Sequence, residues 1–364
     1  MRKIIFWCLM IGATYLMTIW AKANPIWIDD FYLPYIYTNL NKVLFFIFDR
    51  FSFSIGDILY ALAVLLLLRK IVTIFRQKQK IITHLTTVIV QFLAVFYFWF
   101  NLSWGLCNYR TPLHKSLEIP TQYTLADLQH ETQRLINQVN QLQQAIGFGN
   151  ESTNIDRDLT DFSENAKIGY HNIQSITHFS VKNISDVKPS IYSKALSKMG
   201  FGGYFNPFTH ENQVNTEVPA ISLCVTSAHE IAHQLGYASE SEANFLGYLA
   251  LLNQDKLSYQ YAANLFALRY CLREIYRNDN DNIDFFLNQI NEGSRKDISI
   301  VEKFWQSNKN ITADWSNKFY GQFLKLNNQK EGMRSYQQFV NLLIGYHQKM
   351  ILENNSTIYQ SHLQ

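Results

Sequence analysis

Two histidines and a glutamate near the middle of the chain have the spacing of a metal site. They are His229, Glu230 and His233, in the pattern H-E-x-x-H. Residues four apart lie on one face of a helix, so both imidazoles could bind one Zn²⁺ from consecutive turns. Glu230 lies one step round the helix, where its carboxylate can take a proton from a zinc-bound water. The pattern predicts metal-assisted hydrolysis.

The residues around this motif favour a buried site. From Val225 to Gly236, the only formally charged residue is Glu230. An unpaired buried charge is costly, so a carboxylate on a buried helix needs a chemical reason. The alternative is an ordinary core helix whose histidines are satisfied by hydrogen bonds. The sequence favours the metal site, with Zn²⁺ as the expected cofactor.

A catalytic zinc site needs a third protein ligand and leaves its fourth position for water. Gly236 is typical of a helix C-terminus, so we expect the metal helix to end there. Ser239 is then predicted to be the N-cap of a second helix, with Glu242 closing a capping box. Two carboxylates, Glu240 and Glu242, return the chain to the metal within a few residues.

An H-E-x-x-H helix followed by a second helix with E-x-x-x-D or E-x-x-x-N resembles the gluzincin arrangement. The resemblance implies that Glu240 ligates zinc and that Asn244 orients a zinc-bound histidine. The linker differs, because only residues 234–239 lie between the two motifs. This short turn is closer to that of the metzincins, although Ser239 stands where their third histidine would be. Glu242 therefore stays open as the alternative ligand; in that case Glu240 would only place its charge at the helix N-terminus, where it suits the dipole. Motif analogy favours Glu240.

Zincins often hold the oxyanion of the tetrahedral intermediate with a Tyr, His or Arg side chain. Tyr336, Tyr346 and His347, on the last strongly predicted helix, have the right chemistry. No spacing rule brings them to the zinc site, and a role in packing is the favoured alternative. Residues 211–219 are predicted to be extended, either as a strand that lines the cleft or as an ordinary edge strand or loop.

The elements that position this site begin with a membrane segment. Apolar residues make up 48% of the 364 residues and aromatic residues 15%, and the excess lies near the N-terminus. The connection 22–50 is expected to reach the membrane interface at its end. Asp57 is expected at the level of the lipid headgroups or as a helix-packing partner. Three apolar stretches are predicted to be transmembrane helices, at about 4–21, 53–68 and 81–104.

Charge bias predicts how these helices are oriented. Basic residues cluster at the N-terminus and over residues 69–80. The positive-inside rule therefore predicts a cytoplasmic N-terminus, with everything after Trp104 outside the cytoplasm. We expect a multi-pass protein of the bacterial cytoplasmic (inner) membrane. Residues 1–104 would form its membrane domain and residues 105–364 an extracytoplasmic domain with a core of its own.

The rest of the chain is dominated by helical periodicity. A long helix is predicted from 124 to 146, followed by a polar loop from 147 to 164. The fold class is therefore mostly α (α+β): three N-terminal transmembrane helices, then a helix-rich, zincin-like globular domain with a small sheet. Further helices are expected at 258–277, 283–290, 297–306, 312–326 and 335–351.

Composition excludes several other classes. The net charge is only +3, so no nucleic-acid surface is expected. The expected partners are the lipid bilayer and a polypeptide substrate of unknown identity, and nothing predicts an oligomeric state. The four cysteines lack C-x-x-C spacing and predict neither a disulfide framework nor a thiolate zinc site: Cys8, Cys107, Cys224 and Cys271.

The order of these features is similar to that of a bacterial family described as a domain of unknown function. The likeness rests on three apolar spans, the stretch F-G-G-Y-F-N-P-F-T at 201–209, and H-E-I-A-H-Q-L-G-Y-A-S-E-S-E-A-N-F from residue 229. It covers most of the chain. The resemblance implies a membrane-bound, zincin-like protein.

Two functions fit these observations. The first is a membrane-anchored zinc metallopeptidase that hydrolyses an extracytoplasmic polypeptide, with Glu230 activating the water and passing its proton to the leaving amine. The second is a non-catalytic membrane protein that keeps a zincin fold as a structural or binding module. The intact Glu230 counts against the second, because a structural metal needs no general base. An intramembrane protease is rejected, because the apolar run 220–228 before His229 is too short to cross a bilayer.

Overall fold

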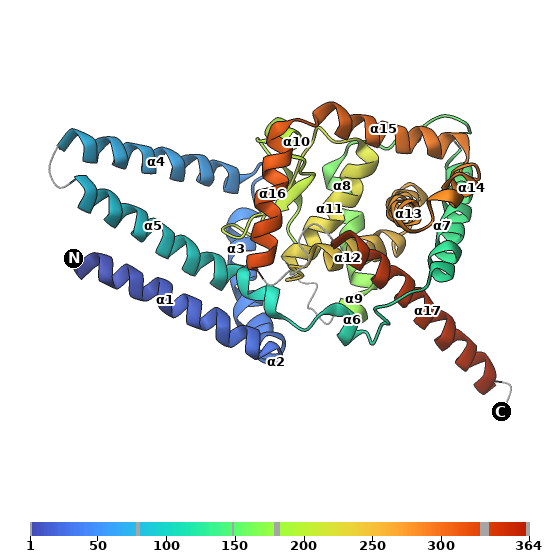
Figure 1. Cartoon of the computed structure of the whole chain (residues 1–364), viewed down its shortest axis with the longest axis horizontal. Coiled ribbons are helices and arrows are strands. Elements are labelled where there is room, and N and C mark those ends of the chain that lie inside the picture. The colour runs from blue at the N-terminus through green and yellow to red at the C-terminus, as the bar shows by residue number, and fades with distance from the viewer. Residues whose placement is uncertain (1, 78–80, 148, 178–182, 328–334, 362–364) are drawn as a thin grey trace.

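The structure is a computed structural model that describes residues 2–77, 81–147, 149–177, 183–327 and 335–361. Three long helices project from one side of a helix-rich body (Figure 1). A small sheet lies within this body. The predicted fold class, mostly α with a small sheet after three N-terminal apolar helices, is confirmed.

The three projecting helices are α1 (Arg2–Ala23), α4 (Ile55–Gln77) and α5 (Ile81–Ser103). Each is long and apolar enough to cross a membrane, and most of their side chains are exposed. Helix α4 is longer than predicted, because it continues beyond residue 68. Arg and Lys are good helix formers, so the end of an apolar run does not end the helix. Helix α5 packs against both α1 and α4.

The two ends of each span lie in different surroundings. The N-terminus of α1 and the adjoining ends of α4 and α5 lie far from the body (Figure 1). The other ends of all three helices meet the body. The far ends of the three helices therefore lie together, on the side away from the body.

The connection between the first two spans is helical over most of its length and packs on the body. It contains α2 (Pro25–Trp27), a π-helix η1 (Ile28–Tyr37) and α3 (Thr38–Phe48). Tyr37 is fully buried, and its hydroxyl donates a hydrogen bond to the carbonyl oxygen of Gln234 at 2.9 Å. Contacts therefore cross the domain boundary that the sequence predicted at residue 104.

The first turn of α4 is inserted into the body. Asp57, which was expected at the lipid headgroups, is fully buried. Its carboxylate accepts hydrogen bonds from the Ser190 hydroxyl at 2.9 Å, the Ile191 amide at 2.8 Å and the Tyr204 hydroxyl. Burial among donors from distant parts of the sequence fits the packing alternative better than exposure to the headgroups.

Glu211 completes the attachment of α4. Its carboxylate accepts the backbone N–H groups of Ile55 at 3.1 Å and Gly56 at 2.6 Å, which are free at a helix N-terminus. The same carboxylate pairs with the buried ammonium of Lys188 at 2.8 Å. The base of this span is therefore held by buried polar contacts.

The sheet has three short strands in the order β1-β3-β2. Strand β1 (Val187–Pro189) is parallel to β3 (Asn212–Val214), and β2 (Gly203–Phe205) is antiparallel to it. The prediction of extended backbone over 211–219 is correct for β3 alone. That strand is central, so β1 and β2 are the edge strands, and β2 packs against α11 (Ala220–Gln234).

Two long helices begin at side-chain caps. Thr124 and Asp127 form a capping box at the start of α7 (Leu125–Ile146), which confirms the predicted helix bounds. Helix α8 (Leu159–Asn172) begins within the predicted loop 147–164, because Asp158 accepts N–H groups of its first turn.

The centre of the body is formed by α11 and α12 (Glu240–Leu252), which pack against α8 and α13 (Leu257–Asn278). The remaining helices are α6 (Leu113–Ser116), α9 (Gln174–Thr177), α10 (Ser193–Met199), α14 (Ile283–Leu287), α15 (Glu292–Asn308), α16 (Ile311–Leu326), α17 (Ser335–Ser361) and the 3₁₀ turns η2 (Gly105–Tyr109) and η3 (Asn280–Asn282).

Replacing Glu211 by Gln is expected to destabilise the protein strongly. The substitution leaves the Lys188 ammonium buried without its counter-charge, which costs about 3–5 kcal/mol of unfolding free energy. Thermal unfolding in detergent micelles measures the loss. The control is Glu151→Gln, which removes an exposed ion pair with Lys296 and should leave the melting temperature nearly unchanged. Equal melting of the two variants would contradict the buried attachment.

Candidate metal centre

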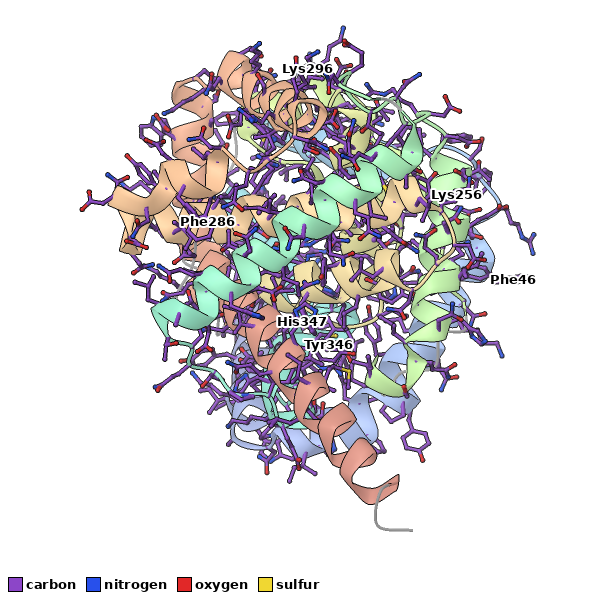
Figure 2. All side chains as sticks on the ribbon, turned by 90° about the vertical axis from the view of Figure 1, so that its right-hand side faces the viewer. Phe46, Lys256, Phe286, Lys296, Tyr346 and His347 are labelled. Atoms are coloured by element: carbon purple, nitrogen blue, oxygen red, sulfur yellow. The ribbon has the colours of Figure 1, made fainter. Side chains whose placement is uncertain are left out.

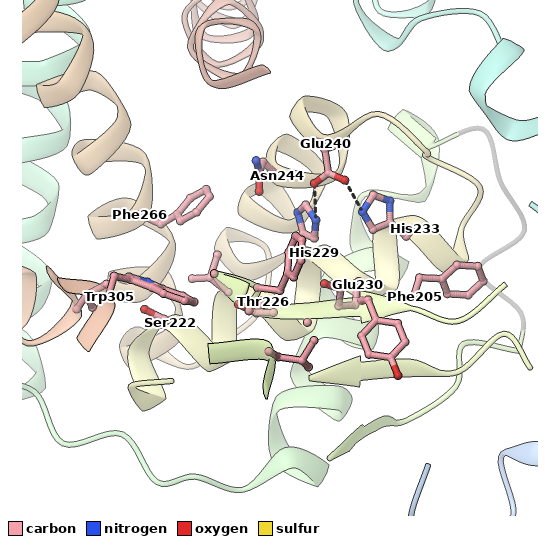
Figure 3. Close-up of a pocket in the computed structure, with 18 of the residues that line it drawn as sticks. Phe205, Ser222, Thr226, His229, Glu230, His233, Glu240, Asn244, Phe266 and Trp305 are labelled. Atoms are coloured by element: carbon pink, nitrogen blue, oxygen red, sulfur yellow. Dashed lines mark ion pairs between the residues drawn. The ribbon is translucent and has the colours of Figure 1, made fainter. Parts of the chain in front are cut away.

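The two histidines of the H-E-x-x-H motif lie on consecutive turns of α11, as predicted. Their ring centroids are 4.7 Å apart. Both Nε2 atoms face the carboxylate of Glu240 at the start of α12 (Figure 3). The distance is 3.3 Å from His229 Nε2 to Oε2, and 3.6 Å from His233 Nε2 to Oε1. The structure therefore brings three predicted site residues together.

These three side chains have a geometry that suits a four-coordinate Zn²⁺. Their potential ligand atoms all lie within 4.8 Å of one another. Ligand bonds of about 2.1 Å in a tetrahedral site place neighbouring ligand atoms about 3.4 Å apart. The separations of 3.3 and 3.6 Å are close to this value, and they end on the two oxygens of one carboxylate. Two imidazoles and one carboxylate are also a ligand set that catalytic zinc sites use.

Glu242, the alternative ligand, points elsewhere. Its carboxylate is buried and accepts the backbone N–H of Leu113 at 2.6 Å. Burial raises the pKa of this carboxyl group, while the Leu113 hydrogen bond and the Arg110 charge oppose the rise. Ser239 precedes α12 with extended backbone, but its side chain does not cap the helix, so the predicted capping box is absent from these described residues. The geometry favours Glu240 over Glu242.

Two glycines bring α12 back against α11. Gly236 follows the end of α11 with φ +82°, a left-handed conformation that favours glycine, and it confirms the predicted helix end. At Gly247, a Cβ atom would lie 3.1 Å from the backbone nitrogen of His229. The turn and this close approach together place Glu240 opposite the imidazoles.

The imidazoles are oriented differently from one another. His233 Nδ1 lies 2.7 Å from the carbonyl oxygen of Tyr237, which directs Nε2 towards Glu240. His229 Nδ1 is buried and has no hydrogen-bond partner in the described part of the chain. Asn244 was predicted to orient a histidine. Its amide lies in the cavity wall and donates to the Tyr270 hydroxyl at 3.5 Å.

The cluster attracts positive charge. Burial lowers the pKa of His233, but the Glu240 carboxylate outweighs burial and raises that pKa to about 9. Burial raises the pKa of Glu240, but hydrogen bonds and charge from both histidines bring it well below its usual range. A metal ion would replace the proton that otherwise balances this carboxylate.

Glu230 lies beside the cluster and is 3% exposed. Burial raises its pKa to about 7, although the two nearby imidazoles and a hydrogen bond from the Phe205 backbone N–H oppose the rise. Its Oε2 atom has no hydrogen-bond partner among the described residues. A Cβ atom at Gly203 would lie 2.9 Å from Glu230 Oε1, so strand β2 covers this carboxylate closely.

A cavity of about 910 Å³ opens beside these residues. Strand β2, α11 and the start of α12 form one part of the wall, and the rest comes from α5, α10, α13, α15 and α16. Phe205, Thr226, Phe266 and Trp305 line it around the candidate metal centre (Figure 3). This volume is typical of a ligand cleft.

The cavity also contains a residue that the sequence did not indicate. Tyr320 lies on α16, and its hydroxyl donates a hydrogen bond to Glu240 Oε1. Residue 320 is distant in sequence from the motif, and no spacing rule links the two. The contact depends on how α16 crosses the body.

The predicted oxyanion candidates lie elsewhere. Tyr346 packs against Phe245 with ring centroids 5.5 Å apart, and His347 Nδ1 lies 3.0 Å from Glu131 Oε1 of α7. Figure 2 shows both on α17, at the end of the body remote from the spans. Neither is among the described residues that line the cavity. The side chain of Tyr336 lies outside the described residues.

Replacing Gly236 by Ala is expected to weaken metal binding as well as stability. The left-handed backbone costs an alanine about 1–2 kcal/mol, and its Cβ would lie 3.2 Å from Leu33 Cδ2. The control is Gly147→Ala, at φ +86° after α7, where the Cβ meets nothing within 4 Å. Both variants should melt earlier, but only Gly236→Ala should bind zinc more weakly. Equal zinc affinity in calorimetry would contradict the role of this turn.

Comparison with known proteins gives a family without a described activity. No curated protein and no solved structure matches the chain. A family model matches residues 32–344, which include two of the three spans and nearly the whole body. The chain therefore belongs to the family described as "Protein of unknown function (DUF3810)".

Proposed function

We propose that this protein is a membrane-anchored zinc metallopeptidase of the zincin type. The observation that supports it most is the convergence of His229, His233 and Glu240, with Glu230 buried beside them. Zn²⁺ held by these three ligands would polarise the scissile carbonyl and make the attacking water more acidic.

Glu230 is the proposed general base and acid. Its pKa of about 7 suits a group that takes a proton from water and then passes it to the leaving amine. The Phe205 backbone N–H holds one side of its carboxylate. Tyr320 is the proposed hydrogen-bond donor to the developing oxyanion, because its hydroxyl already lies at the edge of the centre.

The proposed substrate is a polypeptide outside the cytoplasm of a bacterial cell. The ends of the spans that lie far from the body carry the basic residues, so the positive-inside rule places the body on the other side of the membrane. The edge strand β2 in the cavity wall supports an extended polypeptide as the substrate, since such a strand can pair with a peptide backbone.

Replacing Glu230 by Gln tests the reaction directly. The variant should keep its bound zinc and lose about 10²- to 10⁴-fold in peptide hydrolysis, because the proton acceptor is gone. The control is Glu217→Gln, at an exposed glutamate just before α11, which should hydrolyse like the unmodified protein. Zinc content and cleavage of a peptide library are measured on the same samples. If the unmodified protein and both variants bind zinc and none of them hydrolyses peptides, the non-catalytic module is favoured.

Replacing Glu240 or Glu242 by Gln tests the ligand set. Glu240→Gln should lower zinc affinity by more than about tenfold, since even groups that support metal ligands contribute 10- to 100-fold. Glu242→Gln should leave the affinity of the folded protein unchanged, because that carboxylate faces Leu113. Competition with a chromophoric chelator measures both affinities. A larger loss of zinc affinity in Glu242→Gln than in Glu240→Gln would exclude Glu240 as the third ligand.

A further inference from the structure

An aromatic row on α5 continues onto helix α16. On α5, Phe92, Phe96 and Phe100 are spaced four residues apart, and their rings stack at 6.1 and 6.3 Å. Phe100, near the end of the span that meets the body, contacts Phe323 of α16 at 5.9 Å. The exposed aromatic side chains of α5, Phe92 and Phe96, are therefore linked to α16 through the buried ring of Phe100.

Helix α16 extends this row with two strongly exposed aromatic side chains. Trp315 is 70% exposed and Phe319 is 75% exposed. They precede Phe323 at the same spacing of four residues, so all three lie along one face of the helix. Adjacent aromatic side chains exposed to this degree indicate an interaction surface.

The direction of α16 suits a membrane surface. It runs across the direction of α4 and α5, at the end of the spans that meets the body (Figure 1). A helix that is perpendicular to membrane spans lies in the plane of the bilayer. Trp and Phe are the residues that such interfacial helices place among the lipid headgroups. The exposed Lys318 beside them can interact with anionic headgroups.

The other side of α16 faces the candidate metal centre. Leu324 is buried, Tyr320 packs on Phe201 at 5.2 Å, and the Tyr320 hydroxyl donates to Glu240. One helix thus has an apolar surface next to the spans and a contact with the site.

We propose that α16 is a membrane-surface helix, with Trp315 and Phe319 inserted into the headgroup region of the bilayer. The bilayer then holds α16, and with it Tyr320, over the cavity. The cavity is also lined by Phe100 and Trp104 from the end of α5, so it lies next to the membrane surface. If the proposed function holds, the substrate class is a polypeptide held at that surface.

Fluorescence quenching in lipid nanodiscs tests the membrane contact on the full chain. A bimane probe is attached at Phe319→Cys or at Phe285→Cys, both in a Cys8→Ser background, since the other three cysteines are buried. Phe285 is 63% exposed on α14, at the far side of the body from the spans. Lipids with a nitroxide near the headgroup should quench the probe at 319 several-fold more than the probe at 285. Equal, weak quenching would overturn the proposal, and this result needs neither zinc nor hydrolysis.

A second measurement tests the substrate class separately. A fluorogenic peptide library is supplied either free or attached to a lipid anchor in the same nanodiscs. The anchored library should be cleaved faster, and Trp315→Glu with Phe319→Glu should remove the difference. Equal rates for both libraries would exclude a surface-held substrate. Cleavage of neither library would reject the proposed function, while the quenching result would still decide the membrane contact.

Discussion

The candidate metal centre depends on one carboxylate placed between two imidazoles. Glu240 reaches both Nε2 atoms only because α12 turns back on α11 at Gly236 and approaches it closely at Gly247. Charge then stabilises the arrangement that the backbone sets, because, despite burial, the Glu240 carboxylate raises the pKa of His233 and the two histidines lower the pKa of Glu240. A centre built in this way suits a cation, beside a Glu230 carboxyl group whose pKa burial raises to about 7.

The N-terminal segments take part in the same arrangement. The free carbonyl oxygens at the end of α11 accept hydrogen bonds from Tyr37, from Trp104 Nε1 at 3.4 Å and from the Arg110 guanidinium at 3.1 Å. Helix ends leave such carbonyls without partners within the helix, and a buried end must find them elsewhere. Residues between and after the spans therefore supply hydrogen-bond donors to the C-terminal end of α11.

The sequence predicted correctly those elements that depend on interactions between residues close together in the chain. The spans, α11 and the turn at Gly236 follow from apolar runs, helical spacing and backbone preference. The choice between Glu240 and Glu242 did not follow, because both lie in the first turn of one helix and only the partner Leu113 separates them. The contacts of Asp57 and Tyr320 could not be predicted either, because their partners lie about 147 and 80 residues away in the chain. Contacts at such distances are fixed by the fold as a whole.

The attachment of α4 has a consequence for the biogenesis of the protein. The N–H groups of its first turn are satisfied by a carboxylate that is made about 155 residues later. During synthesis the span is complete long before Glu211 leaves the ribosome, so the growing chain holds an uncapped helix end next to the lipid. The attachment can therefore form only after both α4 and α5 have been synthesised, so the body closes upon helices that are already made.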